Sequence, residues 1–258
     1  DVGVRFYTYL STLYYVMQAC EQYGKDLIVL DRPNPNAAAV DGPILDMSLK
    51  SMVGVLPIPI LHGCTLGELS YMITGESWGV STDFKAHLTV VPCTGWNHAI
   101  PYELPVPPSP NLRSACAIHL YPSLCWFEGT NVSVGRGTQQ SFEMFGFPTL
   151  QKPDFYFTPI SIPGRVQHPP YDGEQCGGRN LQSFCNGPAQ LELKFLQEAY
   201  DNLGDAMFTA PLFFDKLAGT SALRDQLKNH WTEEQIRASW QPGLSTYAAI
   251  RKKYLLYP

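Results

Sequence analysis

The densest group of polar side chains that could bind a ligand lies in residues 128–138, which read Glu-Gly-Thr-Asn-Val-Ser-Val-Gly-Arg-Gly-Thr. Glycines let the backbone come close to a ligand here, and Glu128, Asn131 and Arg136 supply polar contacts. The same segment could instead be a turn in which Arg136 pairs with Glu128 or Glu143. It is neither a Walker loop nor a dinucleotide fingerprint, because no lysine follows the last glycine and G-x-G-x-x-G is absent.

A second group of polar side chains follows a predicted strand, in Asp-Arg-Pro-Asn-Pro at residues 31–35. The prolines exclude a helix, so Asp31 and Asn34 should lie at the carboxyl end of the strand, where open α/β sheets bind ligands. Arg32 precedes a proline, which favours an extended backbone and leaves two alternatives equally open, ligand binding and a structural pairing with a nearby acid.

Glu68 has a structural explanation beside a functional one. In Thr65-Leu-Gly-Glu68 the Thr hydroxyl and the Glu carboxylate form a capping box that predicts a helix from residue 65 to about residue 74. His62 precedes it and could be an ordinary buried imidazole or a ligand-binding one. Asn111 lies in the proline-rich segment 92–114, which predicts a binding loop because long irregular segments usually have a function. Tyr121, like Trp96 and Trp126, is more typical of a core aromatic than of a sugar platform.

Several classes of function are excluded by what the sequence lacks. It has no G-x-S-x-G, H-E-x-x-H, calcium loop or C-x-x-C pattern, so we expect no metal and no cofactor. The net charge of -5 and the absence of a basic run argue against nucleic acid as a partner. The longest uncharged stretches, residues 51–67 and 86–102, are too short for a membrane span.

The periodicity of the apolar residues predicts the elements that would position these side chains. Residues 10–23 form a helical stripe that ends at Gly24, and residues 26–30 form an apolar run typical of a strand buried on both faces. Residues 88–91 and 115–120 are further strand candidates. This helix-then-strand order predicts an α/β fold for residues 1–150.

Residues 151–258 differ in their sequence pattern, in which strand-like pieces interrupted by prolines give way to helices, and this pattern predicts a smaller, helix-rich α+β domain. A strand-like piece at residues 155–162 precedes helices expected at 188–203, 220–230, 232–240 and 245–255, the third opened by a capping box of Thr232 and Gln235. The seven cysteines favour small buried side chains, although Cys176 and Cys185 are close enough in sequence to form a disulfide.

A series of motifs in the same order resembles the exo-β-N-acetylmuramidase family of peptidoglycan exo-hexosaminidases. The motifs are Asp-Val-Gly-Val-Arg-Phe-Tyr-Thr-Tyr at 1–9, Asp-Arg-Pro-Asn-Pro at 31–35, Gly-Pro at 42–43, His-Gly-Cys-Thr-Leu-Gly-Glu-Leu at 62–69, Pro-Ser-Pro-Asn-Leu at 108–112, Glu-Gly-Thr-Asn at 128–131, Gly-Arg-Gly-Thr at 135–138, and Arg251 with Tyr-Leu-Leu-Tyr at 254–257. The resemblance covers essentially the whole chain.

The resemblance implies a Rossmann-like catalytic domain with a doubly wound, mostly parallel sheet, here partial, followed by the smaller domain, with the active site in the cleft between them. It also implies release of N-acetylmuramic acid from the non-reducing end of peptidoglycan fragments, outside the cytoplasm. The family normally has an earlier segment with the first strands and a Glu-His-Gly motif that holds its principal catalytic glutamate. Neither is among the 258 residues, so we expect the remainder of a longer protein. Val134 stands where an acidic residue is expected.

For glycoside hydrolysis we expect Glu68, Glu128 and Asp31 as candidate carboxylates that support the missing acid. Arg136 or Arg32 would bind the lactyl carboxylate of muramic acid, and we favour Arg136 because glycines flank it. The expected sugar-binding residues are Asn34, His62, Asn111, Tyr121 and Asn131. Two other interpretations stay open, a cell-wall glycan binding module without catalysis and an inactive fragment of such an enzyme.

Overall fold

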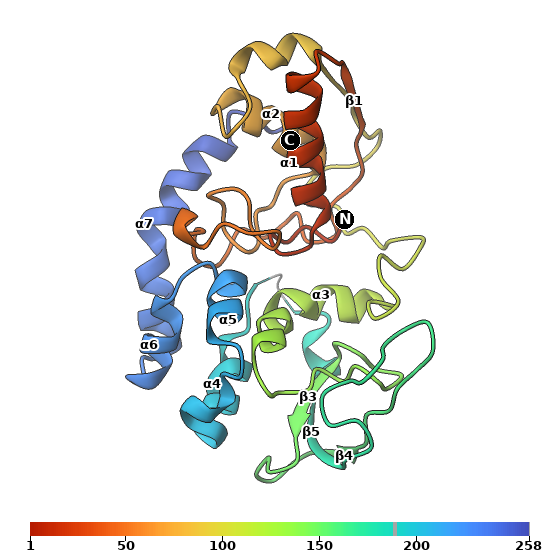
Figure 1. Cartoon of the computed structure of the whole chain (residues 1–258), viewed down its shortest axis with the longest axis vertical. Coiled ribbons are helices and arrows are strands. Elements are labelled where there is room, and N and C mark those ends of the chain that lie inside the picture. The colour runs from red at the N-terminus through yellow and green to blue at the C-terminus, as the bar shows by residue number, and fades with distance from the viewer. Residues whose placement is uncertain (188–189, 258) are drawn as a thin grey trace. The chain divides into compact units, whose positions relative to one another are not determined.

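The computed structural model describes residues 1–187 and 190–257, and the chain forms two compact units (Figure 1). Unit 1 consists of Asp1–Tyr102 together with Ser239–Pro258, and unit 2 consists of Glu103–Ala238. The fold is mixed α/β, as predicted, with a parallel sheet in unit 1 and a separate antiparallel sheet in unit 2. Residue 150, where the composition suggested a domain boundary, falls inside unit 2.

The first helix and strand of unit 1 confirm the local signals in the sequence. Helix α1 (Tyr9–Gln22) ends where Gly24 adopts a φ of 59°. The Gly24 N–H bonds to the carbonyl of Glu21 and the Lys25 N–H to that of Cys20, which is the Schellman arrangement. The chain then enters strand β1 (Leu27–Leu30), which pairs in parallel with β2 (Leu88–Val91).

Only one face of this two-stranded sheet is buried. Val29 and its partner Val90 point into a core built mainly from α1 and α2 (Leu66–Gly75). On the opposite face Ile28 is 64% exposed and Leu30 is 73% exposed. The expectation that β1 is buried on both faces is therefore wrong for the described structure, because no element of it covers that side.

Unit 2 places helices around a three-stranded antiparallel sheet in the order β3-β5-β4 (Figure 1). The strands are β3 (Met144–Phe147), β4 (Phe155–Phe157) and β5 (Cys176–Asn180). The helices are α3 (Ala115–Leu124), α4 (Leu193–Leu203), α5 (Pro211–Ala218) and α6 (Ala222–Lys228). Short 3-10 helices complete both units: η1 (Met47–Leu49), η2 (Thr82–His87), η3 (Cys125–Gly129), η4 (Gln182–Phe184) and η5 (Gly204–Met207).

Two sequence-based assignments of elements are wrong. Residues 115–120, predicted as a strand, begin helix α3, because the Ser114 hydroxyl accepts a hydrogen bond from the Ala117 N–H and caps it. A short, mostly apolar run such as this one fits a buried strand and a buried helix equally well. The two helices predicted on either side of Pro242 form one helix, α7 (Glu233–Arg251), which contains the proline. Residues 188–189 of the helix predicted over 188–203 lie outside the described residues, and the described helix there begins at Leu193.

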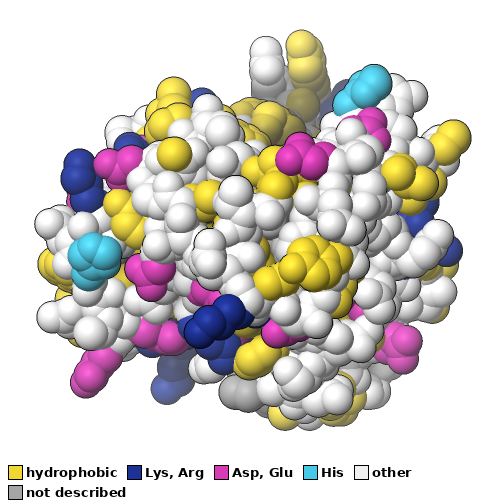
Figure 2. All heavy atoms as spheres, turned by 90° about the horizontal axis from the view of Figure 1, so that it is seen from below, with side chains coloured by type: hydrophobic (Ala, Val, Ile, Leu, Met, Phe, Trp, Pro, Cys, Tyr) yellow, Lys and Arg dark blue, Asp and Glu magenta, His cyan; other side chains and the backbone are white. Residues whose placement is uncertain are grey.

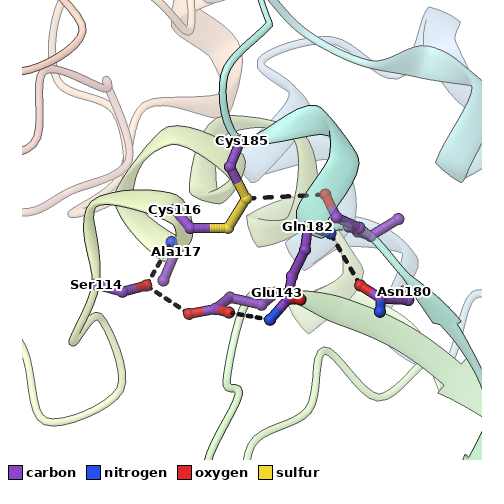
Figure 3. Close-up of a disulfide and its surroundings, with 8 residues drawn as sticks. Ser114, Cys116, Ala117, Glu143, Asn180, Gln182 and Cys185 are labelled. Atoms are coloured by element: carbon purple, nitrogen blue, oxygen red, sulfur yellow. Dashed lines mark hydrogen bonds between the residues drawn. A yellow bond between two sulfur atoms is a disulfide. The ribbon is translucent and has the colours of Figure 1, made fainter.

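A disulfide joins α3 to the segment after β5 (Figure 3). Cys116 bonds to Cys185 with a Cα–Cα distance of 4.8 Å, and 69 positions separate them in sequence. Cys176, the partner considered from spacing alone, is a free buried cysteine in β5. The pairing follows from the fold, because the turn η4 brings Cys185 to the start of α3.

Candidate functional site

The first candidate carboxylate, Asp31, lies at the carboxyl end of β1 and holds the start of α2. Its Oδ1 accepts from the Gly67 N–H at 2.8 Å, and its Oδ2 accepts from the hydroxyls of Thr65 at 2.6 Å and Tyr257 at 2.7 Å. A negative charge is favourable at a helix N-terminus. The approach requires glycine at position 67, since a Cβ there would lie 2.6 Å from Asp31 Cγ. Both carboxylate oxygens of Asp31 are therefore occupied.

The second candidate, Glu68, is fully buried and completes the predicted capping box. Its Oε2 accepts from the Thr65 N–H at 2.9 Å and lies 2.9 Å from His98 Nε2. Its Oε1 accepts from the Leu256 N–H at 2.8 Å. Hydrogen bonds to both oxygens compensate for the burial of this polar group, so Glu68 positions the groups around it.

His98 and Arg251 extend this network and were not among the residues expected from the sequence. Arg251 Nη2 lies 3.4 Å from His98 Nδ1, and Nε and Nη2 of Arg251 donate to the Gly63 carbonyl at 3.0 and 2.6 Å. The two neighbours favour the His98 tautomer with its hydrogen on Nε2, facing Glu68. The available signals were the position of His98 in the predicted binding loop and that of Arg251 in the C-terminal motif.

Two predicted sugar-binding residues of unit 1 are buried and hydrogen-bonded to the protein, although His62 Nε2 has no partner within the described chain. His62 has no exposed surface, and its Nδ1 accepts from the Cys64 N–H at 3.2 Å. Burial, together with the charges of Arg251 and Arg5, lowers the pKa of His62 to about 3, so the ring is neutral. The Asn34 amide donates to the Cys64 carbonyl at 2.9 Å and is only 3% exposed. In this structure neither side chain is open to a ligand.

Arg32, in contrast, is exposed and forms no ion pair or hydrogen bond with any other residue of the described chain. Of the two alternatives left open from the sequence, a structural pair with a nearby acid does not form within the described chain. Pro33 fixes the backbone after Arg32, but the Arg32 side chain extends into solvent and contacts no carboxylate of the described chain. Its guanidinium keeps all of its donors for a ligand.

In unit 2 the polar segment 128–138 forms a cluster with an aromatic centre, which we call the glycine-loop cluster. It consists of Tyr121, Glu128, Asn131, Arg136 and Phe142. Arg136 forms an ion pair with Glu128, as the turn interpretation predicted, and lies over the Phe142 ring at 5.2 Å. Tyr121 packs edge-on against the same ring, with 5.1 Å between centroids. The glycine-loop cluster thus places a carboxylate and a guanidinium on a rigid aromatic base.

Two buried polar atoms of this cluster lack a partner among the described residues, namely Arg136 Nε and Asn131 Oδ1. Buried polar atoms are nearly always hydrogen-bonded, so an unpaired donor and acceptor in one short segment call for an explanation such as a ligand or a bound water. Glu128 is also the only exposed residue of the three candidate carboxylates, because Asp31 is half-buried and Glu68 is buried.

Asn111 is tied to the same segment through Arg165. The Asn111 amide donates to the Arg165 carbonyl at 3.2 Å, and Arg165 Nη2 donates to the Thr138 carbonyl at 3.3 Å. Asn111 Oδ1 is another buried atom without a partner in the described chain. Val134 is buried, so the position where an acidic residue was expected belongs to the core of unit 2.

The ten predicted site residues therefore form two groups. Unit 1 contains Asp31, Arg32, Asn34, His62 and Glu68, and unit 2 contains Asn111, Tyr121, Glu128, Asn131 and Arg136. A single cleft shared by both groups stays a prediction. Within the described residues, no three His, Cys, Asp or Glu side chains group as metal ligands, and no helix is long and apolar enough to cross a membrane.

Comparison with known proteins identifies the family. The model described as exo-β-N-acetylmuramidase NamZ, N-terminal, matches residues 1–116, and the corresponding C-terminal model matches residues 119–257. The chain belongs to the NamZ family. The resemblance drawn from the sequence motifs is thus confirmed. A peptidoglycan β-N-acetylmuramidase NamZ of Bacillus subtilis is 35% identical over 280 residues, which cover 100% of this chain and 66% of the relative.

Two crystal structures of DUF1343 family proteins from Bacteroides fragilis have the same fold as this NamZ-family chain. One is 44% identical with a TM-score of 0.92, and the other is 24% identical with a TM-score of 0.85. Each comparison covers 100% of this chain and 73% of the other. The chain therefore spans about two thirds to three quarters of the length of these relatives.

Proposed function

We propose that the chain is part of an exo-β-N-acetylmuramidase, a glycosidase that releases N-acetylmuramic acid from the non-reducing end of peptidoglycan fragments. The observation that carries the proposal is the match of both NamZ family models, which together cover nearly the whole chain. The activity is proposed for the whole protein, because the chain spans 66% of the curated relative.

Among the candidate carboxylates, Glu128 is the one that the geometry favours for a role at the substrate. Glycoside hydrolysis needs a carboxyl group that can reach the sugar, and Asp31 and Glu68 have all their oxygens bound to the protein. One oxygen of Glu128 is bound by Arg136, and the side chain is 28% exposed. Glu128 is thus the carboxyl group that we propose for this role.

The lactyl carboxylate of muramic acid distinguishes this substrate from other hexosamines and requires a cation. Arg136 already neutralises Glu128, whereas Arg32 has no acidic partner in the described chain. A guanidinium can bind a carboxylate through two parallel hydrogen bonds. We therefore assign lactyl recognition to Arg32, in place of the Arg136 favoured from the sequence.

The disulfide supports a location outside the cytoplasm. Disulfides form and persist in oxidising compartments and are rare in the reducing cytosol. The Cys116–Cys185 bond is consistent with a periplasmic or secreted protein, where peptidoglycan is also found. We propose this location for the protein on that ground.

The test is hydrolysis of a chromogenic β-N-acetylmuraminide by the complete protein, compared with the matching β-N-acetylglucosaminide. Loss of a charge-assisted contact costs ~1.5–3 kcal/mol, so the glucosaminide should react roughly ten- to a hundredfold more slowly. Glu128→Gln should lower kcat strongly, whereas Glu103→Gln, a change at another exposed glutamate, should not. Equal turnover of both substrates would refute lactyl recognition. Glycan binding without any turnover would favour a non-catalytic binding module.

A further inference from the structure

Unit 2 contains a groove whose lining includes none of the residues named in the proposed function. Two adjoining cavities of about 500 Å³ and about 270 Å³ lie along α4 and share Gln197 and Asp201. We call this pair of cavities the α4 groove. The volume of the larger cavity is typical of small-molecule sites. From Lys194 to Asp201 the helix rises about 10 Å, at 1.5 Å per residue, which is the scale of two linked sugar rings.

One end of the α4 groove is formed by an exposed tryptophan. Trp231 lies between α6 and α7, lines the smaller cavity and is 39% exposed. Gln197 Nε2 donates to the Trp231 carbonyl at 3.0 Å, which holds this loop against α4. A large, rigid aromatic ring beside an amide and a carboxylate is a suitable platform for the apolar face of a sugar.

The residue before this tryptophan is unusual for its place in the backbone. Helix α6 ends in a Schellman arrangement, with the His230 N–H bonded to the Leu227 carbonyl and the Trp231 N–H to the Gln226 carbonyl. His230 occupies the left-handed position with a φ of 51°, where glycine is usual and a side chain costs about 1 kcal/mol. Its Nδ1 lies 3.9 Å from Asp201 Oδ1. The His230 imidazole therefore lies at the rim of the α4 groove, although its backbone conformation is unfavourable for a residue with a side chain.

The other end of the α4 groove is polar, with an aromatic wall. Phe184 packs edge-on against Phe195 with 5.2 Å between ring centroids, and Lys194 Nζ lies 3.9 Å from the Phe184 centroid. Asn180 also lines this cavity, and its Oδ1 accepts from the Gln182 N–H, which leaves its amide hydrogens free. Cys185, next to Phe184 in sequence, is fixed by the disulfide to α3 (Figure 3). This wall is thus anchored covalently.

The charges of the α4 groove favour a largely neutral ligand. Arg179 is paired with both Asp154 and Glu198, which leaves a single negative charge among these three groups. Figure 2 shows one face of the whole molecule, on which acidic and basic side chains lie among hydrophobic ones without a large patch of one sign. Hydrogen-bonding amides, one carboxylate and an exposed indole suit a ligand with many hydroxyl and acetamido groups.

We propose that the α4 groove is a second carbohydrate site, which binds the N-acetylhexosamine backbone of a glycan strand across Trp231, Asp201 and Asn180. Only the source of that glycan, peptidoglycan, rests on the proposed function. The second site would keep a polymeric substrate attached while its end is processed elsewhere on the protein.

The test uses tetra-N-acetylchitotetraose, which has the same kind of backbone but no lactyl carboxylate and no terminal muramic acid. Isothermal titration calorimetry on the full chain should show binding that weakens by about tenfold or more in Trp231→Ala and in Asp201→Asn. Tyr156→Ala is the control, because Tyr156 is an exposed aromatic of unit 2 outside both cavities. Circular dichroism and the melting temperature report whether each variant is folded. If Trp231→Ala does not fold, Asn180→Ala tests the opposite end of the α4 groove.

The outcomes separate this proposal from the proposed function. Turnover of a chromogenic monosaccharide muraminide by the complete protein should be unchanged in the α4 groove variants, whose side chains lie outside the proposed catalytic residues. Unaltered chitotetraose affinity in folded Trp231→Ala and Asp201→Asn proteins would overturn the second site, as would binding of stem peptide in place of glycan. Weakened glycan binding in a protein without muramidase activity would support the second site alone.

Discussion

At the scale of single residues, two arginines that look alike in sequence differ in what they contact. Arg136 has its charge satisfied by Glu128 and an aromatic ring beneath it, while Arg32 leaves the surface without a partner in the described chain. The glycines beside Arg136 suggested an open site, but in the structure they allow close packing. A Cβ at Gly137 would lie 2.7 Å from the Ile160 carbonyl oxygen.

We therefore expect Arg32→Lys to lower kcat/KM of the complete protein for a muraminide by about tenfold, because an ammonium keeps the charge but loses the two-pronged geometry. The melting temperature should not change, since no internal contact of Arg32 is lost. Arg113→Lys is the matched control at another exposed arginine. Normal kinetics in Arg32→Lys together with a large loss in Arg136→Lys would restore the assignment made from sequence.

A second residue-scale prediction concerns pH. The pKa of His62 is about 3 in the fold and 6.5 for an ordinary histidine, so between these values the unfolded chain binds one proton more than the folded chain. Stability is then full above the ordinary pKa and falls as the pH drops, with a slope approaching about 1.4 kcal/mol per pH unit for this group.

His62→Gln should flatten that dependence, because glutamine takes up no proton. The check is urea unfolding of the wild type and the variant at several values between about pH 4 and pH 6. His87→Gln serves as the control, since the His87 side chain is 52% exposed. A wild type and a His62→Gln protein that lose stability in parallel would show that His62 does not titrate in this way.

At the scale of elements, the disulfide is the clearest case where long-range structure adds stability. It closes a loop between residues 69 positions apart, for which the chain-entropy model gives about 4 kcal/mol. Cys116→Ser should therefore lower the denaturant midpoint of unit 2, and a reductant should do the same to the wild type.

Cys93→Ser, a change at a free and partly exposed cysteine, is the control for that experiment. A reductant should have no further effect on the Cys116→Ser protein. A wild type whose unfolding is insensitive to reductant would contradict a structural role for this bond.

The elements that could be predicted from sequence are those with local signals. Gly24 ends α1, and the Thr65–Glu68 and Thr232–Gln235 capping boxes mark the starts of α2 and α7. Strands β3 and β5 were missed because glycines weaken any strand signal. The glycines are needed there, since a Cβ at Gly146 would lie 2.0 Å from the Gly177 carbonyl oxygen of the paired strand. The close approach of two backbones cannot be predicted from the sequence of one strand alone.

The candidate site shows the same limit. Asp31 and Glu68 could be found because they lie at a strand end and in a capping box. The hydrogen bonds that occupy their oxygens could not be predicted, because they come from residues far away in sequence. Tyr257 is 226 positions from Asp31, and Leu256 is 188 positions from Glu68. The distinction between a carboxylate open to substrate and one used by the fold therefore required the structure.

At the scale of the whole molecule, the chain leaves unit 1 after Tyr102 and returns to it at Ser239, inside α7. A change in composition along the sequence predicts one boundary between two consecutive domains. It does not predict a C-terminal segment that completes the first unit. Tyr247 of that segment is part of the core beneath the parallel sheet, and its hydroxyl donates to the His62 carbonyl at 2.7 Å. The last residues are thus integral to unit 1.

The open face of the parallel sheet has a consequence for how this chain behaves in solution. Ile28 and Leu30 form an apolar strip on strands whose outer edges are unpaired in the described structure. Exposed apolar strips attract other copies of a chain, and unpaired strand edges form backbone hydrogen bonds with them. Natural proteins suppress both with charged residues, which are absent from β1 itself. The chain should therefore have a low solubility limit and salt out early, and a lysine in place of Ile28 should raise the concentration at which it stays dispersed.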